Sequence, residues 1–97
     1  MQLASMSEPD ETHHWLMRAS ELGYEPAMRR LADFLMQRDP VEALSWLYAD
    51  VLLSGDATAR RRAAALAGQM SAREIDAAQR TGRLYAKEIR DRLQQQR

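Results

Sequence analysis

The chain has 97 residues and no cysteine, which excludes a disulfide framework, a thiol nucleophile and a thiolate metal site. Its net charge is zero, although residues 1–50 hold four bases and nine acids while residues 51–97 hold ten bases and five acids, so the domain as a whole has no general attraction for nucleic acid. No apolar run reaches the roughly 18 residues of a membrane span and no secretory signal opens the sequence, so we expect one soluble, cytoplasmic domain.

An N-terminal segment, residues 1–10, leads into the first predicted helix. Ser7 supplies a hydroxyl N-cap, and Pro9 stands in the first turn, where its missing N–H is harmless. Gly23 is typical of the left-handed position that ends a helix, and Pro26 permits a new first turn. The next helix buries a stripe at helical spacing: Ala27, Leu31, Ala32 and Leu35. These two helices are predicted to form an αα-hairpin.

A second hairpin begins at Asp39. Its carboxylate can accept from the Glu42 N–H while Glu42 reaches back to the cap. The helix that follows has a broad apolar face, so we expect neighbours on two sides. That face comprises Leu44, Leu47, Tyr48, Val51 and Leu52, with Trp46 and Leu53 beside it. Gly55-Asp56 breaks and recaps the chain, and a helix of small residues is expected from Ala59 to Met70.

The last predicted helix opens with a second capping box, Ser71 with Glu74. Its apolar residues recur at spacings of three and four: Ile75, Ala78, Gly82, Tyr85, Ile89 and Leu93. The opposite face is charged, with Asp76–Arg80 and Lys87–Asp91 spaced for surface ion pairs. An amphipathic helix at the end of an array serves as its cap, so we predict a capping helix at 71–93 and a frayed tail at 94–97.

The two hairpins read as an internal repeat. Trp15-Leu16 recurs 31 positions later as Trp46-Leu47, and Gly23 and Ala27 recur 32 positions later as Gly55 and Ala59. Self-similarity at this period is typical of helical repeat architectures. We therefore predict an all-α fold, a short α-solenoid of two helical hairpins plus a C-terminal capping helix, within a single domain at 11–93.

The repeat resembles the Sel1-like repeats, the tetratricopeptide-related helical hairpins of adaptor proteins. The residues that carry the resemblance are Trp15-Leu16, Ala19, Gly23-Tyr24, Ala27, Leu31-Ala32, Ala43, Trp46-Leu47, Gly55-Asp56, Ala59, Met70-Ser71, Glu74-Ile75 and Ala78. They span roughly residues 11–90. The loop at about residues 37–39 is shorter than is usual in the family. The resemblance implies a bacterial or eukaryotic adaptor that holds protein partners in a groove and has no catalytic residues.

Both tryptophans are expected in the core, together with Leu16, Ala19 and Leu22. The outward stripe of the first helix and its counterpart in the third would then form the partner-binding surface. The predicted partner-binding residues are Met17, Arg18, Glu21, Tyr48 and Leu52. The alternative is that Tyr48 and Leu52 only cover the core of the third helix.

No residue pattern indicates catalysis. His13 and His14 are adjacent, so their side chains point about 100° apart on a helix and are poorly placed to share a metal. The serines lack a plausible base and no glycine-rich phosphate loop occurs, so we expect no enzyme activity, no metal and no cofactor. Nucleic-acid contact through residues 60–62 and the last helix is a weaker alternative, because three successive arginines splay around a helix.

The sequence therefore predicts a small protein–protein interaction module. The main alternative is a structural or immunity-type protein that blocks a single partner. Stacked repeats need about three units for a continuous core, so the first hairpin needs a cover. Leu3 and Met6 could fold back as a partial lid, but two apolar side chains cover little area, which favours a second chain as the cover. We expect a weak homodimer with two-fold symmetry through that hairpin, whereas a head-to-tail contact between the acidic and basic halves would build filaments.

Overall fold

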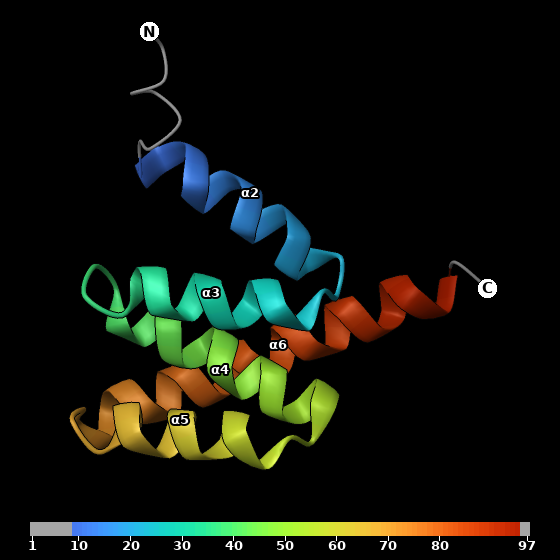
Figure 1. The fold of residues 1–97 in the computed structure, drawn as a ribbon. Helices are drawn as coiled ribbons and strands as arrows, with labels where there is room; N and C mark the ends of the chain where they lie inside the picture. The colour runs from blue at the N-terminus through green and yellow to red at the C-terminus, as the bar shows by residue number, and fades with distance from the viewer. Residues whose placement is uncertain (1–8, 96–97) are drawn as a thin grey trace, which may run out of the picture.

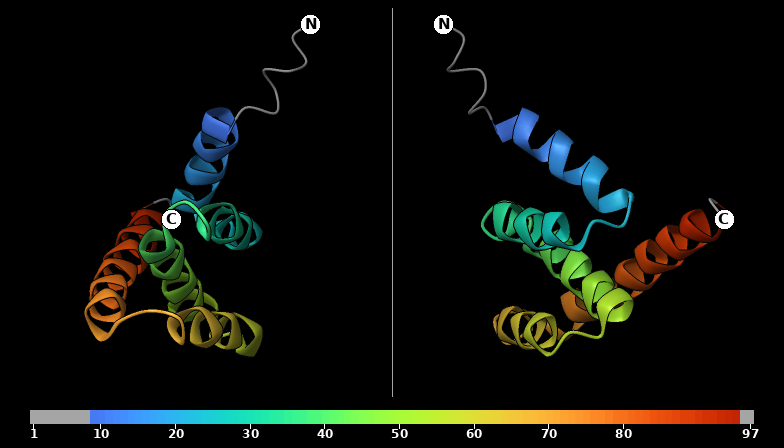
Figure 2. Two further views of the ribbon diagram at one scale, coloured as in Figure 1. Left: turned by 90° about the vertical axis from the view of Figure 1, so that its left-hand side faces the viewer. Right: turned by 45° about the vertical axis from the view of Figure 1, so that its right-hand side comes forward.

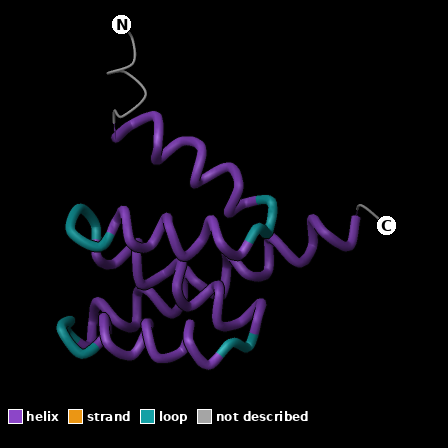
Figure 3. Tube along the Cα trace, in the orientation of Figure 1, coloured by secondary structure: helices purple, strands orange, loops and turns teal. Residues whose placement is uncertain are grey.

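A computed structural model describes residues 9–95, with side chains from residue 11 onward. Within that range the protein is all-α, as predicted, and its helices are joined by short loops (Figures 1 and 3). The helices are α2 (Pro9–Glu21), α3 (Glu25–Leu35), α4 (Pro40–Ser54), α5 (Ala57–Ala67) and α6 (Ala72–Gln95). The N-cap predicted at Ser7 lies outside the described residues. The tail predicted to fray from residue 94 is still helical at Gln95.

Helices α2 and α4 end next to the glycines at which the sequence predicts their ends. Gly23 has φ +90° and Gly55 has φ +69°, a conformation that costs little only without a Cβ. After Gly23 the chain forms a Schellman motif, since the Tyr24 N–H donates to the Ala19 carbonyl at 3.1 Å and the Gly23 N–H to the Ser20 carbonyl at 2.9 Å. The turn between α2 and α3 is thus fixed by backbone hydrogen bonds. Helix α5 ends earlier than predicted, at Ala67 rather than Met70.

The two capping boxes differ. At Ser71 both arms form: the Glu74 N–H donates to the Ser71 hydroxyl at 3.1 Å, and the Ser71 N–H donates to the Glu74 carboxylate at 2.9 Å. At Asp39 only one arm forms, with the Glu42 N–H donating to the Asp39 carboxylate at 3.2 Å. The predicted return arm from Glu42 is wrong, because the Asp39 N–H donates instead to the Leu35 carbonyl at 2.7 Å, and the Glu42 carboxylate accepts from the Trp46 indole N–H at 3.2 Å.

Helix α4 is the centre of the molecule. It packs against α3, α5 and α6, so the expectation that neighbours cover it on two sides is confirmed. Its buried residues follow one another around the helix instead of keeping to one stripe: Ala43, Leu44, Ser45, Trp46, Leu47, Ala49 and Asp50. The core continues into α3 through Met28 and Leu31, both fully buried.

Helix α6 does more than cover the last hairpin. It crosses α4 at Gly82, where the two backbones approach closely, and a Cβ built there would lie 2.8 Å from the Ser45 carbonyl oxygen. Its C-terminal half then reaches the turn between α2 and α3, where the Arg92 guanidinium donates to the Glu21 carbonyl (Figure 1). The predicted surface pairs Asp76–Arg80 and Lys87–Asp91 both form. Helix α6 thereby connects the two hairpins.

Helix α2 lies at the outer edge of the molecule. It packs against α3, and the views of Figure 2 show its N-terminal end leading away from the other helices. The prediction that Trp15 and Leu22 face the core is wrong, since they are 67% and 57% exposed. Leu16 is partly buried and packs against the core as expected. The physical reason is that no described element covers the outer side of α2.

Candidate protein-interaction surface

The largest exposed aromatic side chains come together on the outer side of the first hairpin. Trp15 of α2 and Tyr24, which begins the turn into α3, are 67% and 61% exposed. They line a shallow groove of about 360 Å³ between the two helices, here called the α2–α3 groove. Its lining residues are Trp15, Leu16, Ala19, Tyr24, Pro26, Ala27 and Arg30. The groove is apolar apart from the arginine.

The residues around Trp15 and Tyr24 in the sequence fix where these two side chains lie. The Schellman motif at Gly23 places Tyr24 next to the last turns of α2, and Tyr24 is also the N-cap residue of α3, with φ −79° and ψ 103°. Pro26 fixes the first turn of α3. Trp15 is carried by the middle of α2, whose His14 ring meets the indole edge-on at 5.8 Å between centroids. The groove is therefore built on helices and a constrained turn.

Charged side chains border this apolar surface. Arg30 lines the α2–α3 groove, while Glu11 and Arg18 lie on the exposed side of α2. Among the described residues none of the three takes part in an ion pair. Arg29, one residue before Arg30, differs, because its guanidinium bridges Asp50 and Asp56 at 3.3 and 3.4 Å. The α2–α3 groove thus has one cationic side chain, Arg30, that can pair with a partner, while Arg18 lines a separate hollow with Glu21, Leu22 and Arg92.

The five predicted partner-binding residues do not form one surface. Met17 and Glu21 turn toward α6 and line a separate small cavity, and Arg18 is exposed. Tyr48 packs under α6, since a Cβ built on Gly82 would lie 2.7 Å from the Tyr48 Cβ. Leu52 is 44% exposed, and none of the cavities that involve α2 includes it. The predicted apolar floor is interrupted because α6 lies on Tyr48, so the alternative reading holds for that residue.

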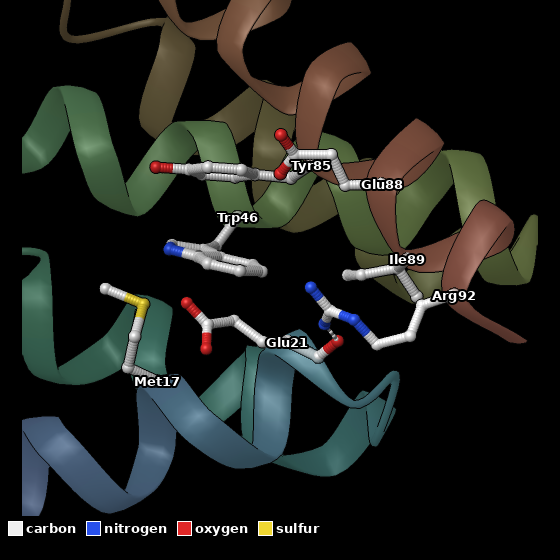
Figure 4. Close-up of a pocket in the computed structure, with 7 residues that line it drawn as sticks. All are labelled: Met17, Glu21, Trp46, Tyr85, Glu88, Ile89 and Arg92. Carbon is white, nitrogen blue, oxygen red and sulfur yellow. Dashed lines mark hydrogen bonds between the residues drawn. The ribbon is translucent and has the colours of Figure 1, made fainter.

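The cavity beside Met17 and Glu21 lies between α2, α4 and α6 (Figure 4). The indole of Trp46 stacks on the ring of Tyr85 at 4.2 Å between centroids, and its other face looks toward Met17 and Glu21. The volume is about 120 Å³, close to the liquid volume of about four water molecules. Pockets for small-molecule ligands are usually about 300 Å³ or larger, so this cavity is a packing feature of the three helices.

Tyr85 is held as a neutral hydrogen-bond donor. Its hydroxyl donates to the Glu42 carboxylate at 2.5 Å, beside the bond from the Trp46 indole N–H to the same oxygen. Burial, and then the hydrogen bond and charge of Glu42, raise the pKa of Tyr85 well above its ordinary value. Glu42 thereby connects the start of α4 to the middle of α6.

The histidine pair, the other feature that the sequence analysis considered as a possible site, does not form a metal site in the described residues. The His13 ring stacks on Phe34 at 5.9 Å between centroids, while His14 meets Trp15, so the two histidines point apart. In the part of the chain that the structure describes, no three His, Asp or Glu side chains gather as metal ligands would. No described helix has both the length and the apolar character needed to cross a membrane.

Much of the basic C-terminal half is already engaged within the protein. Arg62 pairs with Asp33 at 3.6 Å, and Arg90 donates to the Leu52 carbonyl at 2.7 Å. The side chains of Arg80 and Lys87 pair with acids on the same helix. The charges of these four side chains are thus partly balanced by acids or carbonyls of the same chain.

Comparisons with family models, curated proteins and solved structures gave no match to this chain. The Sel1-like resemblance therefore stays a prediction from the sequence.

Proposed function

We propose that the chain is a small protein–protein interaction module that binds a protein partner at the α2–α3 groove. The observation that carries the proposal is the pairing of two exposed aromatic side chains, Trp15 and Tyr24, on one groove. Tryptophan and tyrosine are the residue types that most often dominate binding energy at protein interfaces. Covering them would remove a large apolar area from water, which favours association.

The backbone that carries Trp15 and Tyr24 is rigid, which supports the proposal. Trp15 sits on a helix, and Tyr24 is positioned by the Schellman motif and by the first turn of α3. Side chains presented by a fixed backbone lose less conformational entropy on binding than side chains on a mobile loop. Arg30 at the same groove can donate to a carboxylate of the partner and so set its orientation.

The repeat pattern supports the same class of function. Helices α2–α3 and α4–α5 form two successive hairpins, and the proposed Sel1-like relationship implies an adaptor. The binding surface proposed here differs from the one expected from sequence, because it uses the outer side of the first hairpin. A protein that blocks a single partner would use the same surface and would differ only in the consequence of binding.

Site-specific photo-crosslinking in the source cell tests the proposal. A benzophenone amino acid replaces Trp15 in the full chain, and the control replaces Leu84, which is 59% exposed on α6. We expect a discrete covalent adduct with a protein from position 15 and none from position 84. Equal labelling from both positions, or no adduct from position 15, would contradict the assignment of the α2–α3 groove as the binding surface.

A further inference from the structure

One side of α2 carries a regular exposed stripe. Its members are Glu11, Trp15, Arg18 and Leu22, at spacings of four, three and four residues. At about 100° per residue these positions fall within roughly 60° of one another around the helix axis. The stripe therefore presents an acid, an aromatic ring, a base and an aliphatic side chain in a row.

The charges of this stripe complement a second copy of itself. The midpoint between Glu11 and Arg18 falls between His14 and Trp15. If two α2 helices lie antiparallel about a two-fold axis at that point, each Glu11 faces Arg18 of the other copy and each Trp15 lies near the axis. A parallel pairing would instead place Glu11 against Glu11 and Arg18 against Arg18, which is repulsive.

The charged members of the stripe are free to make these contacts. Neither Glu11 nor Arg18 forms an ion pair with another described residue, whereas Arg29, Arg62 and Lys87 each do. An isologous interface requires that residue i of one copy meets residue j of the other and the reverse. The order acid, aromatic, base satisfies that requirement with Glu11 and Arg18 as the reciprocal pair.

We propose that the partner at this surface is a second copy of the chain, bound through antiparallel α2 helices with Trp15 at the two-fold axis. Two reciprocal Glu11–Arg18 pairs set the register, and the indoles contribute most of the buried apolar area. This inference rests on the proposed function, because the antiparallel pairing covers Trp15, which also lines the α2–α3 groove, and it names the partner that Trp15 contacts. A head-to-tail assembly would not use one surface twice and would not close.

The size of the helix sets the expected affinity. Helix α2 has 13 residues and is about 20 Å long, so the contact lies at the small end of protein interfaces, below about 1,200 Å² in total. A dimer of this size is weak, with a dissociation constant that we expect in the micromolar range or above. The surface ion pairs contribute little individually, so salt should weaken the dimer only modestly.

The test is a charge swap followed by sedimentation velocity on the full chain, over roughly three decades of concentration. Glu11→Arg leaves two arginines on the stripe, and Arg18→Glu leaves two glutamates. Each variant alone should self-associate about tenfold more weakly than the wild type, because like charges then face each other twice. An equimolar mixture of the two variants should associate about as tightly as the wild type, because every facing pair is again opposite in sign.

Two further variants make the result specific. Arg83→Glu changes an exposed charge on α6 and should leave self-association unchanged. Trp15→Gln should abolish the dimer whatever the charges, and helical circular dichroism verifies that each variant is folded. No mixed dimer between the two charge variants, or a wild-type dimer for either variant alone, would overturn the antiparallel pairing.

Failure of this inference can be told apart from failure of the proposed function. If the chain stays monomeric at every concentration but position 15 crosslinks to a different protein, the antiparallel dimer is contradicted and the proposed binding surface is supported. A chain that stays monomeric and gives no adduct at position 15 would contradict both the antiparallel dimer and the proposed binding surface.

Discussion

Trp15 and Trp46 occupy equivalent positions in two successive hairpins, 31 residues apart, yet Trp15 is 67% exposed and Trp46 is 1% exposed. The difference comes from the neighbours of their helices. Helix α4 packs against α3, α5 and α6, whereas α2 stands at the edge and packs mainly against α3. The same residue type is therefore a core residue in one hairpin and an exposed side chain in the other.

Truncation of the two tryptophans should separate these roles. We expect Trp46→Ala to lower the free energy of unfolding by roughly 3–5 kcal/mol, because it removes a buried aromatic ring and its stack on Tyr85. Trp15→Ala should lower it by less than about 1 kcal/mol, since most of its side chain is already in water. Urea denaturation at low protein concentration measures both, and equal losses would contradict the assigned burial.

The crossing of α4 and α6 depends on Gly82. A Cβ there would lie 2.7 Å from the Tyr48 Cβ and 2.8 Å from the Ser45 carbonyl oxygen, so Gly82→Ala has to push the helices apart. We expect a loss of about 1–3 kcal/mol in unfolding free energy, despite the better helix propensity of alanine.

Gly68 provides the matched control. It ends α5 with φ −63°, and a Cβ there would meet only ordinary contacts at 3.5 Å or more. Gly68→Ala should be neutral or stabilising by up to about 1 kcal/mol. Thermal denaturation of both variants checks the prediction, and a neutral Gly82→Ala would show that α6 does not cross α4 as described.

The buried carboxylate of Asp50 depends on Arg29. Asp50 is fully buried, and Arg29 donates to it at 3.3 Å from a partly exposed position. Arg29→Met keeps the aliphatic stem but leaves the carboxylate without its cation. We expect a loss of about 2–3 kcal/mol, below the value for fully buried pairs because water screens Arg29 in part.

Arg62→Met tests whether charge removal alone explains such a loss. Its pair with Asp33 spans 3.6 Å, and both side chains are largely in water. The expected change is within about 0.5 kcal/mol. Similar losses for Arg29→Met and Arg62→Met in chemical denaturation would argue against a special role for the Asp50 contact.

The raised pKa of Tyr85 predicts a loss of stability in alkali. The folded state keeps the phenol protonated above the ordinary value of 10.0, because it is buried and bonded to Glu42. This contribution is complete below that pH and declines as pH rises above it, where the unfolded chain loses the proton first. Melting temperatures between about pH 9 and pH 11 should fall more steeply for the wild type than for Tyr85→Phe. Identical slopes would contradict the raised pKa of Tyr85.

Local features of the chain could be predicted from the sequence. The glycines at 23 and 55, the caps at Asp39 and Ser71, and the surface ion pairs of α6 each depend on residues within a few positions of one another. Their energetics are therefore nearly independent of the rest of the fold. The all-α class follows from the same short-range interactions and is as expected.

The candidate site was only partly predictable. The first hairpin was expected to lack a cover, and its outer side is indeed where exposed aromatic residues gather. Of the predicted binding residues on α2, Met17 and Glu21 turn toward α6, and Arg18 is exposed. Trp15 was assigned to the core because its repeat partner Trp46 belongs there. Periodicity identifies the apolar side of a helix, but it does not say whether another helix lies against that side.

Tertiary structure alone decided which apolar side chains are buried. Helix α6 packs on Tyr48 at Gly82, donates to the Glu42 carboxylate through Tyr85 and reaches the α2–α3 turn through Arg92. These contacts join residues separated by 34 to 71 positions, so they cannot be predicted from the sequence of either helix alone. Burial is a property of the assembled neighbours, so equivalent residues such as Trp15 and Trp46 acquire opposite roles.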